Sequence, residues 1–116
     1  MSENKKTIET YMIAFEKGDR LKVLSCLADN VVWIIPGVFH LEGKKEFESE
    51  IRNDAFQGDP VITVTRITEE NDVVIAEGSV RTQKKSGEFI NLVFCDVFEM
   101  QSGKIQKLTS YLMEVK

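Results

Sequence analysis

The sequence predicts an α+β fold in which helices in the first half pack on an antiparallel sheet formed by the second half. Apolar side chains near the N-terminus recur at helical spacing, whereas the second half consists of segments rich in Val, Ile and Thr separated by short polar turns. Such turns can join antiparallel neighbours but leave no room for the crossover helices of a parallel sheet. The second half should therefore form a meander.

Two helices are expected at the N-terminus. Apolar residues at positions i, i+3, i+4 and i+7 give the first helix one buried face, and they are Ile8, Tyr11, Met12 and Phe15. Gly18 should end this helix, and Asp19 should cap a second, short helix. The buried face of the second helix is expected to consist of Leu21, Leu24, Leu27 and Ala28, before Asp29 and Asn30 end it.

A strand and a third helix are expected next. Residues 31–35 form a short apolar run that stops at Pro36–Gly37, which is typical of a buried strand entering a turn. Residues 43–54 return to helical spacing, because Phe47 and Ile51 lie four positions apart among Lys and Glu.

Four further strands are expected, at residues 61–68, 73–82, 89–100 and 104–115. The third of them is apolar on both faces, whereas a strand covered on one side should alternate. One face carries Ile90, Leu92, Phe94, Asp96, Phe98 and Met100, and the other carries Phe89, Val93, Cys95 and Val97. The helices can cover one face. A second copy of the protein is the expected cover for the outer face, which predicts a homodimer; a sheet curled enough to shield both sides is the alternative.

The composition is typical of a single globular domain spanning residues 1–116. Hydrophobic residues make up 42% and charged residues 29% of the chain, so it can build one core without metals or disulfides. The net charge of -4, without a basic patch, argues against nucleic acid as a partner. Cys26 and Cys95 lie in apolar stretches and are expected to be buried free thiols.

Several other classes of protein are excluded by what the sequence lacks. The first six residues are polar and charged, and no segment approaches membrane-spanning length, so a cytoplasmic protein without membrane contact is expected. His40 is the only histidine, which argues against a metal site. The sequence has no phosphate-binding loop, dinucleotide fingerprint or nucleophile motif, so no cofactor is expected.

Three stretches of the sequence carry a family resemblance: residues 11–19, residues 28–37 followed by Gly43, and residues 95–105. In this order they resemble the NTF2-like superfamily, and within it the SnoaL-like proteins and the ketosteroid isomerases. The resemblance covers nearly the whole chain. It implies a cone-shaped fold in which a curved antiparallel sheet wraps around N-terminal helices and encloses a pocket. Because this superfamily includes enzymes, binding modules and transport factors, the fold leaves the function open.

Asp96 is the most informative candidate for chemistry, because it interrupts an apolar face between Phe94 and Phe98. An isolated carboxylate there would be costly to desolvate. It must therefore be paired, lie in a wet cavity, or be protonated with a raised pKa. A structural ion pair with Arg66 or Arg81 is the alternative to a role in a pocket.

Tyr11 is the second candidate, since its phenol lies on the apolar face of the first helix and needs a hydrogen-bond partner. A core tyrosine is the alternative. The resemblance implies more: Tyr11 and Asp96 match the tyrosine and the aspartic acid that form the oxyanion hole of ketosteroid isomerases. The isomerases place their catalytic base directly before the proline of the first strand, where this sequence has Ile35.

His40 and Glu77 are further candidates for proton transfer. His40 is expected in a loop at the rim of the cavity, and histidine changes charge near neutral pH; a solvated loop histidine is the alternative. The resemblance to SnoaL-type polyketide cyclases implies a pocket aspartate as acid–base, which would be Asp96 alone or with His40. Glu77 would add to the pocket only if the face of its strand that also carries Arg81 points inward.

The pocket walls are expected to be mostly apolar, as is usual for small-molecule sites, and a packed core is the alternative. The expected ligand-binding residues are Phe15, Trp33, Phe47, Ile51, Phe94, Phe98, Leu108 and Leu112. One hypothesis is an acid–base enzyme of isomerase or cyclase type acting on a hydrophobic carbonyl compound. The alternative is a non-catalytic binding module for an apolar ligand, favoured by Ile35. An adaptor resembling the nuclear transport factor is a third.

Overall fold

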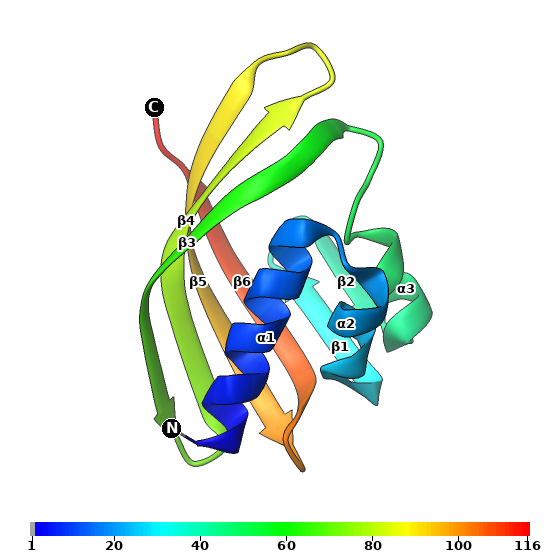
Figure 1. Ribbon diagram of the computed structural model, residues 1–116, viewed down its shortest axis with the longest axis vertical. Helices are drawn as coiled ribbons and strands as arrows, with labels where there is room; N and C mark the ends of the chain where they lie inside the picture. The colour runs from blue at the N-terminus through cyan, green and yellow to red at the C-terminus, as the bar shows by residue number, and fades with distance from the viewer. Residues whose placement is uncertain (1) are drawn as a thin grey trace.

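The computed structural model describes residues 2–116 and shows a curved, unclosed sheet of six strands in the order β2-β1-β6-β5-β4-β3. Helix α1 crosses the concave side of this sheet, and α2 and α3 lie beside β1 and β2 (Figure 1). The helices are α1 (Glu3–Lys17), α2 (Arg20–Ser25) and α3 (Gly43–Ser49), and the strands are β1 (Leu27–Ile35), β2 (Phe39–Glu42), β3 (Phe56–Glu70), β4 (Val73–Lys84), β5 (Phe89–Gln101) and β6 (Lys104–Glu114). The predicted fold class is confirmed.

Helix α1 ends at the predicted signal, but the residue that caps its start was not predicted. The Ser2 hydroxyl accepts a hydrogen bond from the Lys5 amide at 3.1 Å, which caps the first turn. Gly18 ends the helix as predicted, in the left-handed conformation with φ of 71°. Asp19 then caps α2 by accepting from the Lys22 amide at 3.2 Å. The short Gly18–Asp19 link therefore sets where α1 stops over the sheet.

Helix α2 is shorter than the sequence predicted, and it buries a different face. Val23 is fully buried, whereas Leu21 is 82% exposed. Leu27 and Ala28 belong to β1 instead of the helix. The reason is a long-range bond: the Cys26 carbonyl accepts from the Ile105 amide at 2.8 Å, so the chain joins β6 directly after the helix.

Helix α3 also ends early, at Ser49, where the sequence predicted a helix to residue 54. Ile51 remains buried although it lies outside the helix. Strand β2 was not predicted. It forms because the turn at Pro36–Gly37, with Gly37 at φ of 79°, folds the chain back so that His40 pairs with Ile34.

The predicted meander is confirmed, because β3, β4, β5 and β6 pair antiparallel in sequence order. Strand β3 starts at Phe56, five residues before the predicted start at residue 61. No local pattern indicated how the first strand joins the sheet. Strand β1 pairs parallel with β6, opposing Trp33 to Leu108, and this pairing brings the two halves of the chain together.

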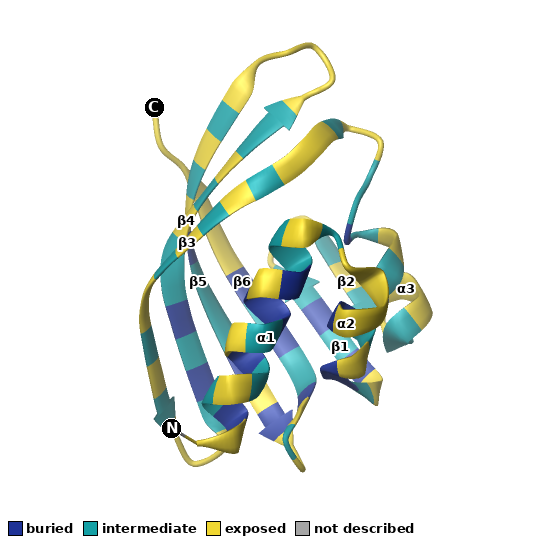
Figure 2. Cartoon of the chain, in the orientation of Figure 1, coloured by how far each residue is buried: buried dark blue, intermediate teal, exposed yellow. Residues whose placement is uncertain are grey.

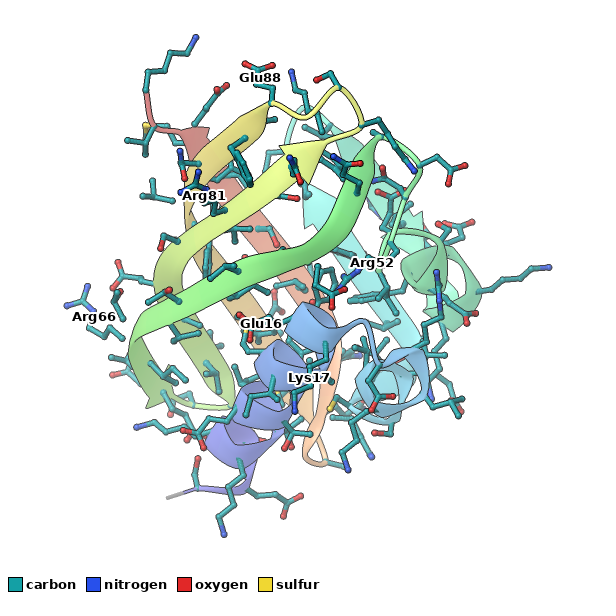
Figure 3. All side chains as sticks on the ribbon, turned by 45° about the horizontal axis from the view of Figure 1, so that its top comes forward. Glu16, Lys17, Arg52, Arg66, Arg81 and Glu88 are labelled. Carbon is teal, nitrogen blue, oxygen red and sulfur yellow. The ribbon has the colours of Figure 1, made fainter. Side chains whose placement is uncertain are left out.

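The two faces of β4 differ sharply. Val74 and Ala76 are fully buried, so their face points toward the helices, and Glu77 and Arg81 point outward. Arg66 forms an ion pair with Glu77 on this outer side. Figure 3 shows Arg66 and Arg81 projecting from the sheet away from the helices.

The core fills one end of the concave side. Buried segments concentrate in the lower halves of the strands, below the extended β4–β5 hairpin (Figure 2). The completely buried side chains include Phe47, Phe98 and Leu108. None of the helices in residues 2–116 has the length and apolar character that crossing a membrane requires.

Candidate functional site

An inner cavity of about 210 Å³ lies between α1, the β1–β2 hairpin and the concave face of the sheet. A water molecule occupies about 30 Å³ in the liquid, so this space holds roughly seven waters or one small organic molecule. Most of the lining is apolar. The lining residues with polar atoms are Tyr11, Trp33, Glu50, Asp96 and Ser110, and the others are Met12, Phe15, Ile35, Phe39, Ile62, Val80, Leu92, Phe94 and Leu112.

A wider outer cavity of about 690 Å³ leads from the inner cavity to solvent. The two cavities share eight lining residues: Phe15, Ile35, Phe39, Glu50, Ile62, Val80, Leu92 and Leu112. Its mouth is polar and includes Arg20, Arg52, Asp54 and Lys85. A ligand can therefore pass a charged mouth and a ring of apolar side chains before it reaches the inner cavity.

Arg52 holds the mouth in place. Its guanidinium donates to the Glu16 carbonyl at 2.8 Å and to the Asp59 carboxylate at 2.9 Å, which ties the end of α1 to the start of β3. The Glu16 carboxylate in turn accepts from the Ile62 amide at 2.7 Å. Figure 3 shows Arg52 and Glu16 near each other at this junction.

Tyr11 enters the inner cavity from α1, and only 3% of it is exposed. Its ring packs edge-on against Phe98 at 5.5 Å and Phe47 at 6.2 Å between centroids, which fixes where the phenol points. Burial raises the pKa of the phenol well above its ordinary value, and the nearby charge of Asp96 adds to this effect. The Tyr11 hydroxyl is therefore protonated and able to donate throughout the physiological pH range.

Asp96 enters the same cavity from β5, between Phe94 and Phe98. It is accessible from the cavity, but protein atoms enclose it on most sides. Desolvation by burial raises the pKa of this carboxyl to about 7, and a hydrogen bond with Ser110 opposes part of that rise. None of the ion pairs within residues 2–116 includes Asp96. The two arginines considered as its partners have other contacts: Arg66 pairs with Glu77, and the Arg81 guanidinium lies 4.2 Å from the Phe89 ring centroid.

Ser110 connects Asp96 to Trp33. Strand β6 places Ser110 directly opposite Asp96, and the buried Ser110 hydroxyl accepts from the Trp33 indole N–H at 3.0 Å. Because an indole can only donate, the hydroxyl proton of Ser110 is left for Asp96. Trp33 is itself held by stacking on Phe47, with centroids 4.5 Å apart. The Asp96 carboxyl therefore sits in a fixed orientation on the floor of the cavity.

Glu50 supplies a second carboxyl group to the lining. It follows the last residue of α3, where its amide donates to the Phe47 carbonyl at 3.1 Å. One of its carboxylate oxygens, Oε1, accepts from the Asn53 amide group at 3.3 Å. Glu50 borders both the inner and the outer cavity, so it stands where the two cavities meet.

Gly78 is needed for this arrangement of the sheet. It faces Phe94 across β4 and β5, and a Cβ atom there would lie 2.0 Å from the Thr63 carbonyl and 2.9 Å from the Phe94 ring. The absent side chain lets Phe94 lie against the sheet. Any larger residue at position 78 would push the Phe94 ring toward the cavity.

The structure divides the expected site residues among the inner cavity, the outer cavity and the closed core. Tyr11 and Asp96 line one cavity, together with four of the expected apolar wall residues, Phe15, Trp33, Phe94 and Leu112. Ile51 borders only the outer cavity. The expectation needs correction for Phe47, Phe98 and Leu108: all three are completely buried and are absent from the lining, because the helices pack directly on that end of the sheet.

His40 also needs correction, because it is not in a rim loop. It pairs with Ile34 on β2, and its side chain lies 3.3 Å from the Glu42 carboxylate on the exposed side of the hairpin. Phe39, on the opposite side of the same strand, lines the cavity instead. Glu77 faces outward, as described above, and Ile35 borders the inner cavity with an apolar side chain.

Sequence reasoning missed several lining residues, with Glu50 the most important for chemistry. Phe39 and Leu41 alternate with His40 and Glu42, which was a readable strand signal. Glu50 gave no such signal, since it is one of several acids along α3. No group of three or more His, Cys, Asp or Glu within residues 2–116 is arranged to hold a metal ion.

The family model described as a SnoaL-like domain matches residues 8–108. No curated protein matches the sequence. Three solved structures illustrate the likeness of the fold. An NTF2-like protein of unknown function from Burkholderia pseudomallei is 21% identical, with a TM-score of 0.90 over 97% of this chain and 92% of that one.

An LEH-like epoxide hydrolase of M. tuberculosis is 20% identical, with a TM-score of 0.84 over 96% of this chain and 83% of that one. TerC, crystallised with polyporic acid, is 19% identical, with a TM-score of 0.84 over 94% of this chain and 90% of that one. At these identities the likeness is one of fold. The predicted resemblance to the NTF2-like superfamily is thereby confirmed.

Proposed function

The chain belongs to the SnoaL-like domain family, and we propose that it is an acid–base enzyme of isomerase or cyclase type acting on a small, apolar carbonyl compound. A phenol and a carboxyl group whose pKa is raised line its inner cavity. The observation that carries the proposal is that Tyr11 and Asp96 face one cavity from different elements. Burial raises the pKa of Asp96 to about 7, so much of the carboxyl is neutral at physiological pH.

In this proposal a ligand carbonyl oxygen accepts hydrogen bonds from the Tyr11 hydroxyl and from the protonated Asp96 carboxyl. Both donors are fixed in place, Tyr11 by the rings around it and Asp96 by Ser110. Donors held at the oxygen stabilise negative charge as it develops there during enolisation. The apolar walls strengthen this effect because they exclude water from the site.

The expected ligand-binding residues form part of the proposal. Phe15, Trp33, Phe94 and Leu112 would contact the body of the ligand in the inner cavity, and Ile51 would contact groups that extend into the outer cavity. The TerC structure, crystallised with polyporic acid, supports the idea that this fold accommodates a small organic molecule.

The test uses 2-tetralone, an apolar bicyclic ketone, and the indole N–H signal of Trp33 in a nitrogen-15 NMR spectrum. Trp33 is the only tryptophan and lines the cavity, so this one signal reports binding there. Binding should be tightest below about pH 7 and weaken above it, because the Asp96 carboxyl ionises and stops donating. Asp96→Asn keeps a neutral donor and should make binding independent of pH.

Tyr11→Phe should weaken 2-tetralone binding about tenfold, the equivalent of one hydrogen bond of about 1.4 kcal/mol. Thermal unfolding of each variant checks that the fold is intact. Binding that responds neither to pH nor to either substitution would contradict the proposal.

A second candidate function is a non-catalytic binding module for an apolar ligand. It is favoured by Ile35, which puts an apolar side chain into the cavity where the resemblance implies a base. The same ketone separates the two functions. A binding module would shift the Trp33 signal but leave the exchange of the ketone's α-hydrogens with deuterated water at the rate found in buffer.

We further propose that the single-domain chain works as a cytoplasmic homodimer through the outer sheet face. Val93, Tyr111 and Met113 on β5 and β6 are between 41% and 68% exposed, and the two strands pair side by side. This is more apolar surface than isolated exposed residues usually present. Val93→Lys should shift the sedimentation coefficient from dimer to monomer; a wild-type monomer at all concentrations would contradict the proposal.

A further inference from the structure

Glu50 is the one carboxyl group besides Asp96 that lines the inner cavity among residues 2–116. We propose that Glu50 is the general base of the site, taking a proton from the carbon next to the carbonyl that Tyr11 and Asp96 bind. This inference rests on the proposed function and extends it, because it defines the substrate as a ketone with a removable α-hydrogen. The resemblance assigns the base to a different position, that of Ile35.

The position of Glu50 suits a base for three reasons. Its backbone is anchored, since it lies between the completely buried Phe47 and the 2% exposed Ile51. Asn53 binds only one of its carboxylate oxygens, Oε1, which orients the group and leaves Oε2 to accept a proton. The bond to Asn53 therefore orients the Glu50 carboxylate and leaves Oε2 available to accept the proton.

The contrast with Asp96 assigns the two roles. Asp96 lies on the floor of the inner cavity and does not border the outer one, whereas Glu50 borders both cavities and is in reach of solvent. Two carboxyl groups in such different surroundings divide acid and base functions between them. Water in the outer cavity can also exchange the proton that Glu50 acquires, which renews the base after each turnover.

The Glu50 carboxylate takes the α-hydrogen as a proton, and the electron pair of that C–H bond forms a carbon–carbon double bond. The π electrons of the carbonyl move onto its oxygen, which is stabilised by hydrogen bonds from Tyr11 and Asp96. Return of the proton to the same carbon restores the ketone, with exchange if that proton comes from solvent. In a β,γ-unsaturated ketone, return of the proton to the γ-carbon completes an isomerisation.

The experiment measures how fast 2-tetralone exchanges its α-hydrogens for deuterium in deuterated buffer at neutral pD, followed by proton NMR. Wild-type protein should accelerate exchange over buffer. Glu50→Gln should lose at least about 100-fold of that acceleration while the Trp33 signal still reports binding. Glu48→Gln is the matched control, two residues away on α3: Glu48 is absent from the lining of both cavities, so exchange should stay at the wild-type rate.

The outcomes separate this inference from the function on which it rests. Loss of exchange in Tyr11→Phe, measured at saturating ketone, with wild-type exchange in Glu50→Gln overturns the role of Glu50 and leaves the proposed function standing. Loss in Glu50→Gln with wild-type exchange in Tyr11→Phe supports Glu50 and overturns the oxyanion site. Wild-type protein that does not accelerate exchange overturns both. Circular dichroism and thermal unfolding verify that each variant is folded.

Discussion

Asp96 and Glu77 are acidic residues on neighbouring strands, one position apart in register, with opposite surroundings. Asp96 opposes Ala76 on the concave side, and Glu77 opposes Cys95 on the convex side. Glu77 forms an ion pair with Arg66, whereas Asp96 meets a cavity, a serine hydroxyl and aromatic rings. Only the pleat of the sheet separates the two environments.

This difference shows that the environment of an acidic side chain in a strand depends on the face of the sheet to which it points. On the convex side the Glu77 carboxylate forms an ion pair with Arg66. On the concave side no ion pair within residues 2–116 includes Asp96, and desolvation raises the pKa of this carboxyl to about 7. An acidic side chain is therefore part of a surface ion pair on one face and a carboxyl group of raised pKa on the other.

The largest expected effect is on the free energy of unfolding, which should respond differently to substitutions on the two faces of β5. Phe98 is completely buried on the concave side, whereas the next residue, Glu99, is exposed. Phe98→Ala should lower the free energy of unfolding by about 3–5 kcal/mol, since it opens a void in the filled end of the core. Glu99→Ala should change it by about 0.5 kcal/mol or less. Urea denaturation measures both, and equal losses would refute the contrast.

The next effect concerns the pH dependence of stability. The pKa of Asp96 is about 7 in the folded protein and about 3.9 in an unfolded chain, so the folded state holds a proton that the unfolded state has lost between these values. Stability should therefore fall as pH rises from about 4 to about 7. Asp96→Asn removes this loss and should be more stable than wild type by up to about 4 kcal/mol at pH 8, with the pH-dependent part of this gain absent at pH 4.

Glu77→Gln is the matched control for this comparison. It removes an exposed ion pair, so its effect should stay within about 1 kcal/mol between about pH 5 and pH 9. Urea denaturation across this range gives both curves. A difference between wild type and Asp96→Asn that stays constant with pH would show that desolvation does not govern the carboxyl.

The smallest effect tests the hydroxyl that links Trp33 to Asp96. Ser110→Ala removes the hydrogen bond that lowers the pKa of Asp96, so this pKa should rise above about 7. It also leaves the buried Trp33 indole N–H without its acceptor, at a cost of about 1–3 kcal/mol. Carbon-13 NMR of the Asp96 carboxyl measures the pKa, and Ser110→Thr, which keeps a hydroxyl, should behave like wild type. An unchanged pKa in Ser110→Ala would exclude the link.

Much of the site was foreseeable from local patterns. Tyr11 follows the helical period of the first segment, and Asp96 shares the period-two face of Phe94 and Phe98. The opposite face of that strand is also apolar, so only the structure decides that the face of Asp96 points toward the helices. The local patterns could not show where the concave side of the sheet is filled by packed side chains and where it encloses a cavity. Phe98 packs under α1 and is completely buried, whereas Phe94, four residues earlier on the same face, borders the cavity.

The sequence by itself determined the end of α1 at Gly18, the cap of α2 at Asp19 and the meander of the last four strands, because these depend on residues close together in the chain. Only the tertiary structure decided that β1 joins β6 in parallel, that α2 gives way to a strand at Leu27, and that Glu50 reaches the cavity. Each of these features depends on contacts between segments that are distant in the sequence. A local pattern carries no information about which distant segment will pack against it.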